Sequence, residues 1–145
     1  MINFKTIIRI IGILLLLETV MLLACSAISY YYNDEALLDF WKSAGITAGA
    51  GLLMTIAGKG GEKQLTRRDG YVLVSLAWVA FSLFGMLPFY ISGYVPDITN
   101  AFFETMSGFT STGATVLDNI ESLPHGLLFW RGMTQWIGGL GIIMF

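Results

Sequence analysis

A hydroxyl-rich stretch between two long apolar segments holds the residues of this chain that are best suited to binding chemistry. It reads ETMSGFTSTGATVLD, from Glu104 to Asp118. It contains two glycines, Gly108 and Gly113, and a set of hydroxyl residues: Thr105, Ser107, Thr110, Ser111 and Thr112. The sequence pairs no nucleophile with a base and has neither a metal-ligand cluster nor an H-E-x-x-H motif. We therefore expect a binding segment and not an enzyme, with main-chain carbonyl oxygens as ligands for a cation.

The residues at the start of this stretch predict a short helix from Ile98 to Phe109. Apolar side chains recur there at helical spacing: Ile98, Ala101, Phe102, Met106 and Phe109. Asp97 or Thr99 can cap its start, because a side-chain oxygen can accept from the unpaired N–H groups of the first turn. A helix of this length is about 18 Å long, a little over half of a ~30 Å hydrocarbon core. It cannot cross a bilayer, so we expect it to enter the membrane and turn back.

The return from this helix is predicted to be an extended segment over 110–115 that lines a cavity. Lipid offers no partners for its backbone, so irregular structure at that depth must border water or protein. Small hydroxyl side chains keep the segment thin, and Gly113 permits backbone angles that other residues resist. Successive carbonyl oxygens can then face one way, beside the negative end of the helix dipole, and favour a dehydrated cation. The alternative, a Ser- and Thr-rich surface loop, fits Phe102 and Phe103 poorly.

Composition and long apolar runs place this segment in a membrane protein. Hydrophobic residues make up 55% of the 145 residues and charged residues 12%, half the share that is usual in soluble domains. Apolar runs long enough to span a bilayer lie at Ile7–Ile28, at about 36–57 and at Tyr71–Tyr90. A fourth run begins near Gly126 and is still apolar at Phe145, from which we expect a fragment of a longer protein.

Basic residues indicate which ends of these runs face the cytoplasm. Most Lys and Arg residues lie around the start of the first run or between the second and third: Lys5, Arg9, Lys59, Lys63, Arg67 and Arg68. The positive-inside rule places them, and the amino terminus, on the cytoplasmic side. The motif GKGGEK lacks the order of a phosphate-binding loop, so we expect a flexible basic loop at 59–70. A net charge of −2 and the lack of a basic tail argue against nucleic acid as a partner.

Two long motifs in the correct order carry a resemblance to a known family: NAFFETMSGFTSTGATVL from Asn100 and FWRGMTQWIGGLGIIMF from Phe129. The chain resembles the Trk/Ktr/HKT superfamily of potassium transporters, specifically the bacterial TrkH/TrkG-type membrane subunit. The resemblance implies an all-α polytopic membrane protein. It has an N-terminal transmembrane hairpin at 1–58, a basic cytoplasmic loop at 59–70, and one M1–pore helix–M2 repeat with a re-entrant P-loop at 71–145. That repeat is expected to be truncated in or at the end of M2.

The resemblance further implies potassium uptake across the cell (inner) membrane, with this chain supplying the first quarter of a four-repeat selectivity filter. The implied K⁺ ligands are the backbone carbonyls of Thr110, Ser111, Thr112 and Gly113. Filter support is implied for Glu104, Ala114 and Thr115. The family also implies a homodimer of the full-length subunit, a cytosolic nucleotide-binding regulatory ring, and no cofactor besides the transported K⁺. The channel pattern of two glycines and a tyrosine is absent, as in the family, so Rb⁺ is expected to be accepted as well.

Two alternatives to a conducting pore segment stay open on the sequence alone. One is a non-conducting membrane interaction or assembly module, and the other is a two-helix channel subunit that forms tetramers.

Glu18 lies mid-span and is expected to make a structural hydrogen bond rather than to couple to ions. Arg131 either snorkels to the membrane interface or contacts the pore-helix loop. Gly45 and Gly49 form a G-x-x-x-G pair that predicts close helix packing, and Pro88 is expected to bend the third span.

Overall fold

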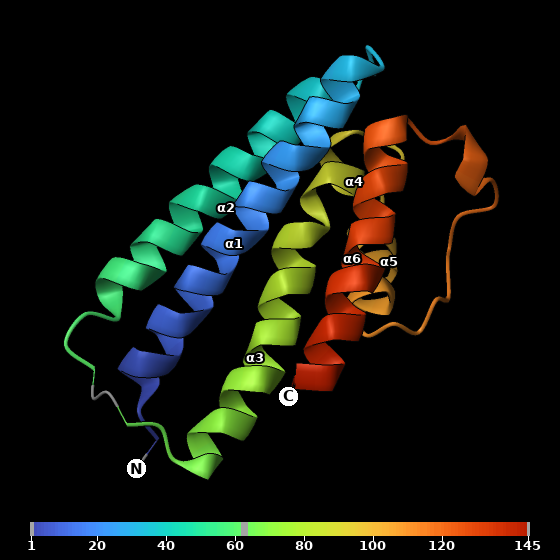
Figure 1. The fold of residues 1–145 in the computed structure, drawn as a ribbon. Helices are drawn as coiled ribbons and strands as arrows, with labels where there is room; N and C mark the ends of the chain where they lie inside the picture. The colour runs from blue at the N-terminus through green and yellow to red at the C-terminus, as the bar shows by residue number, and fades with distance from the viewer. Residues whose placement is uncertain (1, 62–63, 145) are drawn as a thin grey trace.

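Regular structure in the described part of the chain, residues 2–61 and 64–144, consists of helices only. The computed structural model contains α1 (Phe4–Tyr31), α2 (Leu37–Ala57), α3 (Arg67–Gly85), α4 (Leu87–Ile91), α5 (Ile98–Phe109), the 3₁₀ turn η1 (Ile120–Ser122) and α6 (His125–Met144) (Figure 1). The all-α fold expected from the sequence is therefore confirmed. Lys63 and Phe145, which belong to the expected basic loop and fourth apolar run, lie outside the described residues.

Helices α1 and α2 form an antiparallel hairpin whose backbones come close at glycines (Figure 1). A Cβ atom on Gly12 of α1 would lie 2.8 Å from the carbonyl oxygen of Gly51 on α2, so a larger residue does not fit there. The packing predicted at Gly45 and Gly49 is wrong within this chain, because an added Cβ at either would meet nothing within 4 Å. Instead α2 packs through its other face, made by the buried residues Phe40, Ser43, Ala44, Thr47 and Gly51.

The start of α3 is tied to the start of α1, and the two helices run parallel. Thr66 and Asp69 form a capping box, in which each side chain accepts a hydrogen bond from the backbone N–H of the other. The second carboxylate oxygen of Asp69 accepts from the Asn3 N–H at 3.0 Å. Helix α3 ends at Gly85, and α4 follows with Pro88 in its first turn. This break is the bend expected at Pro88, because proline lacks the N–H that the next helical hydrogen bond needs.

At the opposite end of the bundle the turn between α1 and α2 is joined to the start of α6. The carboxylate of Asp34 accepts a hydrogen bond from the Gly126 N–H at 3.0 Å and lies 3.4 Å from His125 Nδ1. The His125 ring stacks on Tyr32, with ring centroids 4.1 Å apart. Asp34 thereby supplies a partner for an N–H in the first turn of α6 that has none within the helix. The hairpin is thus fastened to the other helices at both ends.

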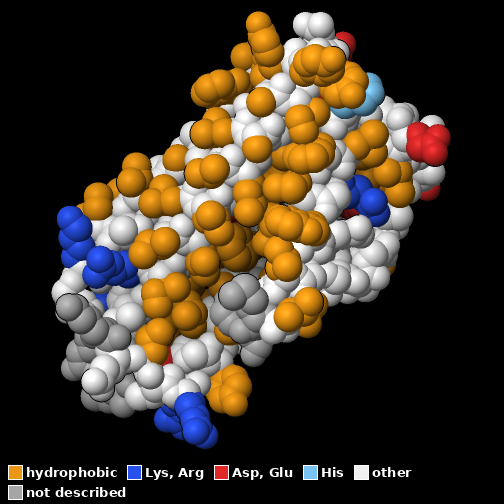
Figure 2. Space-filling model, in the orientation of Figure 1, with side chains coloured by type: hydrophobic (Ala, Val, Ile, Leu, Met, Phe, Trp, Pro, Cys, Tyr) orange, Lys and Arg blue, Asp and Glu red, His pale blue; other side chains and the backbone are white. Residues whose placement is uncertain are grey.

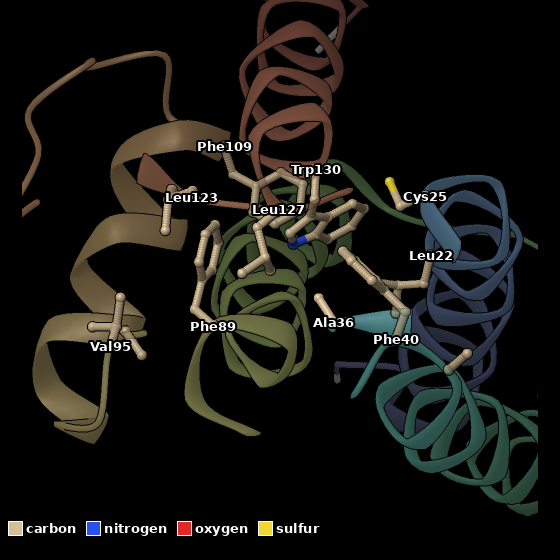
Figure 3. Close-up of a cluster of buried hydrophobic side chains, with 12 residues drawn as sticks. Leu22, Cys25, Ala36, Phe40, Phe89, Val95, Phe109, Leu123, Leu127 and Trp130 are labelled. Carbon is tan, nitrogen blue, oxygen red and sulfur yellow. The ribbon is translucent and has the colours of Figure 1, made fainter. Parts of the chain in front are cut away.

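A buried apolar cluster fills the space between the hairpin and the later helices (Figure 3). Its members come from α1, α2, α4, α5 and α6 and include Leu22, Cys25, Phe40, Ala44, Phe89, Ala101, Phe109, Leu127 and Trp130. Trp130 lies near the centre: its ring meets that of Phe109 edge-on at 6.4 Å, and its Nε1–H donates to the Gly85 carbonyl at 2.9 Å. The cluster therefore holds the end of α5 against α6 and against the break after α3.

Two helical segments are long and apolar enough to cross a bilayer, namely α1 and the α3–α4 unit over Arg67–Ile91. Helices α2 and α6, also expected as spans, form as helices but do not meet that criterion within the described residues. Both carry charged side chains, Lys42 in α2 and Arg131 in α6, and both pack along other helices of the bundle. Figure 2 shows apolar side chains over most of the visible face of the long helices, with Lys and Arg gathered mainly toward the lower end.

Candidate ion-binding site

Helix α5 runs over Ile98–Phe109, the bounds that the apolar periodicity predicts. Asp97 caps it by accepting a hydrogen bond from the Thr99 N–H at 3.2 Å. The helix runs parallel to α6, because contacting pairs advance along both: Glu104 with Arg131, Gly108 with Thr134, and Phe109 with Gly138. Since α6 continues to Met144, α5 ends partway along it (Figure 1).

Two glycines let the carboxyl end of α5 lie directly on α6. A Cβ atom on Gly138 would overlap the carbonyl group of Phe109, and one on Gly108 would overlap the Thr134 hydroxyl. That hydroxyl is held in place, because it donates to the Arg131 carbonyl at 2.7 Å. The position at which α5 ends is therefore set largely by backbone contact. Sequence spacing did not reveal these contacts, since it does not show which glycine meets which helix.

After α5 the backbone turns its N–H groups back onto the helix. Four successive N–H groups donate to carbonyls of the last turn: Thr110 to Met106 at 2.9 Å, Ser111 to Gly108 at 2.9 Å, Thr112 to Ser107 at 2.9 Å and Gly113 to Ser107 at 3.4 Å. These bonds satisfy carbonyl groups that the end of a helix otherwise leaves unpaired. Thr110 and Ser111 form a turn, so the prediction of a uniformly extended segment over 110–115 was wrong. The physical reason is that the end of a helix leaves carbonyl groups unpaired, and the N–H groups that follow α5 turn back to bind them.

The carbonyl groups of these peptides face the opposite way. In a trans peptide the C=O of one residue points opposite to the N–H of the next, and no cis peptide occurs among the described residues. The oxygens of Thr110, Ser111 and Thr112 therefore point away from the end of α5, and we call them the carbonyl row. No hydrogen bond from a described residue reaches the carbonyls of 110–113. The row is left free to bind a ligand.

Two residues of this segment have positive φ, and only one of them is glycine. Gly113 has a φ of +78°, in a region that glycine adopts without steric cost. Ser111 has a φ of +57°, a left-handed conformation that is uncommon for a residue with a Cβ atom. Its hydroxyl donates to the Gln135 carbonyl at 3.4 Å, which ties this turn to α6. Nothing in the sequence marked Ser111 for this conformation.

Hydroxyl groups fix the turn from the side of α5. Thr110 Oγ1 donates to the Met106 carbonyl at 2.7 Å and lies 2.8 Å from Thr112 Oγ1. Because the single hydroxyl proton of Thr110 is used at Met106, the Thr112 hydroxyl donates to Thr110. The Ser107 hydroxyl donates to the Ala114 carbonyl at 2.6 Å. Ala114 is therefore turned back toward α5, and its carbonyl does not extend the row.

Glu104 is the point at which α5, α6 and the return segment meet. Its side chain is 1% exposed, and Oε1 accepts from Arg131 Nε at 2.7 Å. Oε2 accepts from the Thr115 hydroxyl at 2.9 Å and from the Val116 N–H at 3.1 Å. Arg131 was expected either to snorkel or to contact the loop after this helix, and the structure instead pairs it with Glu104 within α5. Hydrogen bonds to charged groups are shorter and stronger than neutral ones, so Glu104 binds the segment firmly without reaching the carbonyl row.

Glu18, a buried acidic residue of α1, does not make the predicted hydrogen bond. Its side chain lies against Gly85, where an added Cβ would be 2.8 Å from Oε1. Neither carboxylate oxygen has a hydrogen-bond partner among the described residues. The hydroxyl of the next residue, Thr19, donates to the Leu15 carbonyl instead, and the Thr105 hydroxyl donates to the Ala101 carbonyl. The prediction was wrong because these hydroxyls pair within their own helices.

Residues 39–145 match the family model TrkH, which is described as a cation transport protein. The chain belongs to the TrkH family. The Trk system potassium uptake protein TrkH of Halomonas elongata is 37% identical over 143 residues, which cover 98% of this chain and 30% of that protein. TrkG of Escherichia coli K12 is 33% identical over 136 residues, which cover 92% of this chain and 28% of that protein.

A solved structure of a TrkH protein is also similar to this chain. The crystal structure of the potassium transporter TrkH from Vibrio parahaemolyticus gives a TM-score of 0.91 at 38% identity, over 98% of this chain and 31% of that one. The family and the helical fold expected from the two sequence motifs are therefore confirmed. Together with the apolar helices, the match makes this a membrane protein. The chain spans about 30% of the length of the TrkH relatives that it matches.

Proposed function

We propose that this TrkH-family chain takes part in potassium uptake across the cell inner membrane and supplies one of four segments of a K⁺ selectivity filter. The observation that supports this most is the carbonyl row, whose oxygens on Thr110, Ser111 and Thr112 face one way and accept no hydrogen bond from a described residue. The similar proteins are named as potassium uptake proteins, which agrees with the proposal.

A row of free carbonyl oxygens suits K⁺ because it can replace the water around the ion. Carbonyl oxygens stand in for the hydration shell in potassium filters, and they bind weakly enough to release the ion again. The carboxyl end of α5 adds the negative end of its helix dipole close to the same place. Gly113 contributes the fourth carbonyl ligand in this proposal, and Glu104, Ala114 and Thr115 hold the segment from behind. Rb⁺ is accepted as well.

One such segment contacts an ion from one side only. The remaining sides come from three further segments of the complete protein, of which this chain corresponds to about 30% by comparison with its relatives. The basic residues near the starts of α1 and α3 lie in the cytoplasm together with the amino terminus, so α5 enters the membrane from the outside. A homodimer and a cytosolic nucleotide-binding ring are the proposed partners, in line with the family resemblance.

The substitution Gly113→Ser in the complete protein tests this proposal. An added Cβ would lie 4.0 Å from its nearest neighbour, the Gln135 amide nitrogen, so overlap is not the reason for any effect. The reason is the φ of +78°, since left-handed backbone costs residues with a Cβ atom roughly 1–2 kcal/mol. We expect the peptide to rotate and disturb the row. A bacterial strain that lacks its own K⁺ uptake should then grow poorly on low K⁺, or take up K⁺ with less preference over Na⁺.

The matched control is Gly45→Ser, on a face of α2 where an added Cβ meets nothing within 4 Å. It should support growth as the unmodified protein does. If Gly113→Ser supports growth and K⁺ preference equally well, the segment is a packing device of a non-conducting assembly module and the proposal is wrong.

A further inference from the structure

We infer that Arg131 is a positioning residue for ion selectivity: it fixes Glu104, and Glu104 fixes the carbonyl row through the return segment. The inference rests on the proposed function, because it takes the row to be the element that selects K⁺. Arg131 itself makes no hydrogen bond to the carbonyls of 110–113. Its effect on the ion therefore passes through Glu104.

The two carboxylate oxygens of Glu104 serve different elements. Oε1 is bound by Arg131 Nε from α6, and Oε2 is bound by the Thr115 hydroxyl and the Val116 N–H of the return segment. The last torsion of a glutamate side chain is broad, with no sharp rotamer of its own. The 2.7 Å bond to Arg131 removes this freedom by holding one oxygen, and so leaves the other aimed at Val116. With the Glu104 side chain 1% exposed, water has no access to take over either bond.

Three anchors hold the return segment on α5, and they lie on both sides of Gly113. The first is the set of N–H bonds from 110–113 to the last turn of α5. The second is the bond from the Ser107 hydroxyl to Ala114, and the third is the pair of bonds that Glu104 accepts from the Thr115 hydroxyl and the Val116 N–H. Without the third anchor only Ser107 holds the chain beyond Gly113. Residues 111–116 are exposed, so no packing replaces the lost bond.

A filter discriminates K⁺ from Na⁺ through the spacing or the number of its carbonyl ligands. A row anchored on one side can move inward onto the smaller ion, so we expect the loss of Arg131 to lower discrimination before it abolishes flux. Residues that orient the ligands of a bound ion typically change its affinity or activity by roughly 10–100-fold when mutated. The expected change in K⁺/Na⁺ preference is accordingly on the order of tenfold.

The test measures K⁺, Rb⁺ and Na⁺ uptake by the complete protein in reconstituted vesicles, for Arg131→Met, Arg131→Lys and the exchange Glu104→Arg with Arg131→Glu. Arg131→Met should lose about tenfold in K⁺/Na⁺ preference. Arg131→Lys keeps the charge and should lose less. The exchange restores an ion pair. It also places the N–H donors of an arginine at position 104, where the Val116 N–H and the Thr115 hydroxyl need an acceptor, so selectivity should stay low. Asp34→Asn, which alters the distant contact to His125 and Gly126, should leave selectivity unchanged.

Two results would overturn this inference. Unchanged selectivity in Arg131→Met shows that Glu104 keeps its place unaided, and restored selectivity in the exchange shows that the pair acts only as a salt bridge. If Arg131→Met does not reach the membrane, Arg131→Lys serves as the test. Should Arg131→Lys select K⁺ as well as the unmodified protein does, the Nε bond is not needed and the inference is wrong. These outcomes differ from a failure of the proposed function, in which the unmodified protein carries no K⁺ or Gly113→Ser behaves as the unmodified protein does.

Discussion

The indole N–H of Trp130 donates a hydrogen bond to the carbonyl of Gly85 at 2.9 Å, in the interior of the helix bundle. Gly85 is the last residue of α3, where the chain breaks before Pro88, so its carbonyl loses the partner that a continuing helix would give it. Trp130 supplies that partner from α6, and its fully buried ring packs against Phe109 at the end of α5. One side chain thus joins the break in α3 to the helix that positions the carbonyl row.

Trp130→Phe removes this donor but keeps most of the apolar volume. A buried carbonyl left without a partner costs about 1–3 kcal/mol, so the midpoint of thermal unfolding in detergent, followed by far-UV circular dichroism, should fall. Trp136→Phe is the matched control on the same helix, because Trp136 is 61% exposed and donates no hydrogen bond within the described residues. Equal midpoints for the two variants would mean that the bond to Gly85 adds nothing to stability.

Gly138→Ala and Gly108→Ala each create a steric overlap, but only the overlap at Gly108 should be relieved by a second substitution. An added methyl at Gly138 overlaps the backbone of Phe109, whereas at Gly108 it overlaps only the Thr134 hydroxyl. Overpacking costs typically 1–3 kcal/mol, so each single variant should unfold at a lower temperature. Combining Gly108→Ala with Thr134→Ala should recover part of that loss, while Gly138→Ala combined with Thr134→Ala should not. An equal recovery in both pairs would contradict the assigned contacts.

Glu18→Met should stabilise the protein, although it replaces a charged residue by an apolar one. Both oxygens of Glu18 are buried without a partner among the described residues. A buried polar group left without a partner costs about 1–3 kcal/mol, so an apolar side chain of similar volume at this position should raise the free energy of unfolding.

Glu104→Met provides the contrast to Glu18→Met, because Glu104 is equally buried but bonded to Arg131, Thr115 and Val116. Breaking a buried pair on one side costs about 3–5 kcal/mol, so its unfolding midpoint should drop. A lower midpoint for Glu18→Met would show that its carboxyl group has a stabilising partner after all.

Much of the architecture followed from local sequence patterns. The helix Ile98–Phe109 was predicted with the correct bounds, and Asp97, one of the two candidate caps, caps it, because apolar spacing and a capping side chain act within one or two turns. The break at Pro88 followed for the same reason, since the missing N–H is a property of the residue itself. The family was recognisable from two motifs, and the matched fold agrees with it.

The site required more than local pattern. The sequence marked Gly113 for an unusual backbone conformation but not Ser111, whose φ of +57° arises because its N–H returns to Gly108 and its hydroxyl to Gln135. It also left Arg131 either at the membrane interface or against the loop after α5, whereas the structure binds it to Glu104 within α5 at 2.7 Å.

The sequence alone determined which long segments form helices and, for Ile98–Phe109, where the helix begins and ends, because these depend on neighbours along the chain. Only the tertiary structure decided which faces meet: Gly12 and Gly51 rather than Gly45 and Gly49, and Glu104 with Arg131 while Glu18 stays unpaired. Such contacts join residues far apart in the chain, and the rotation of each helix about its axis is set by the packing of all its neighbours at once.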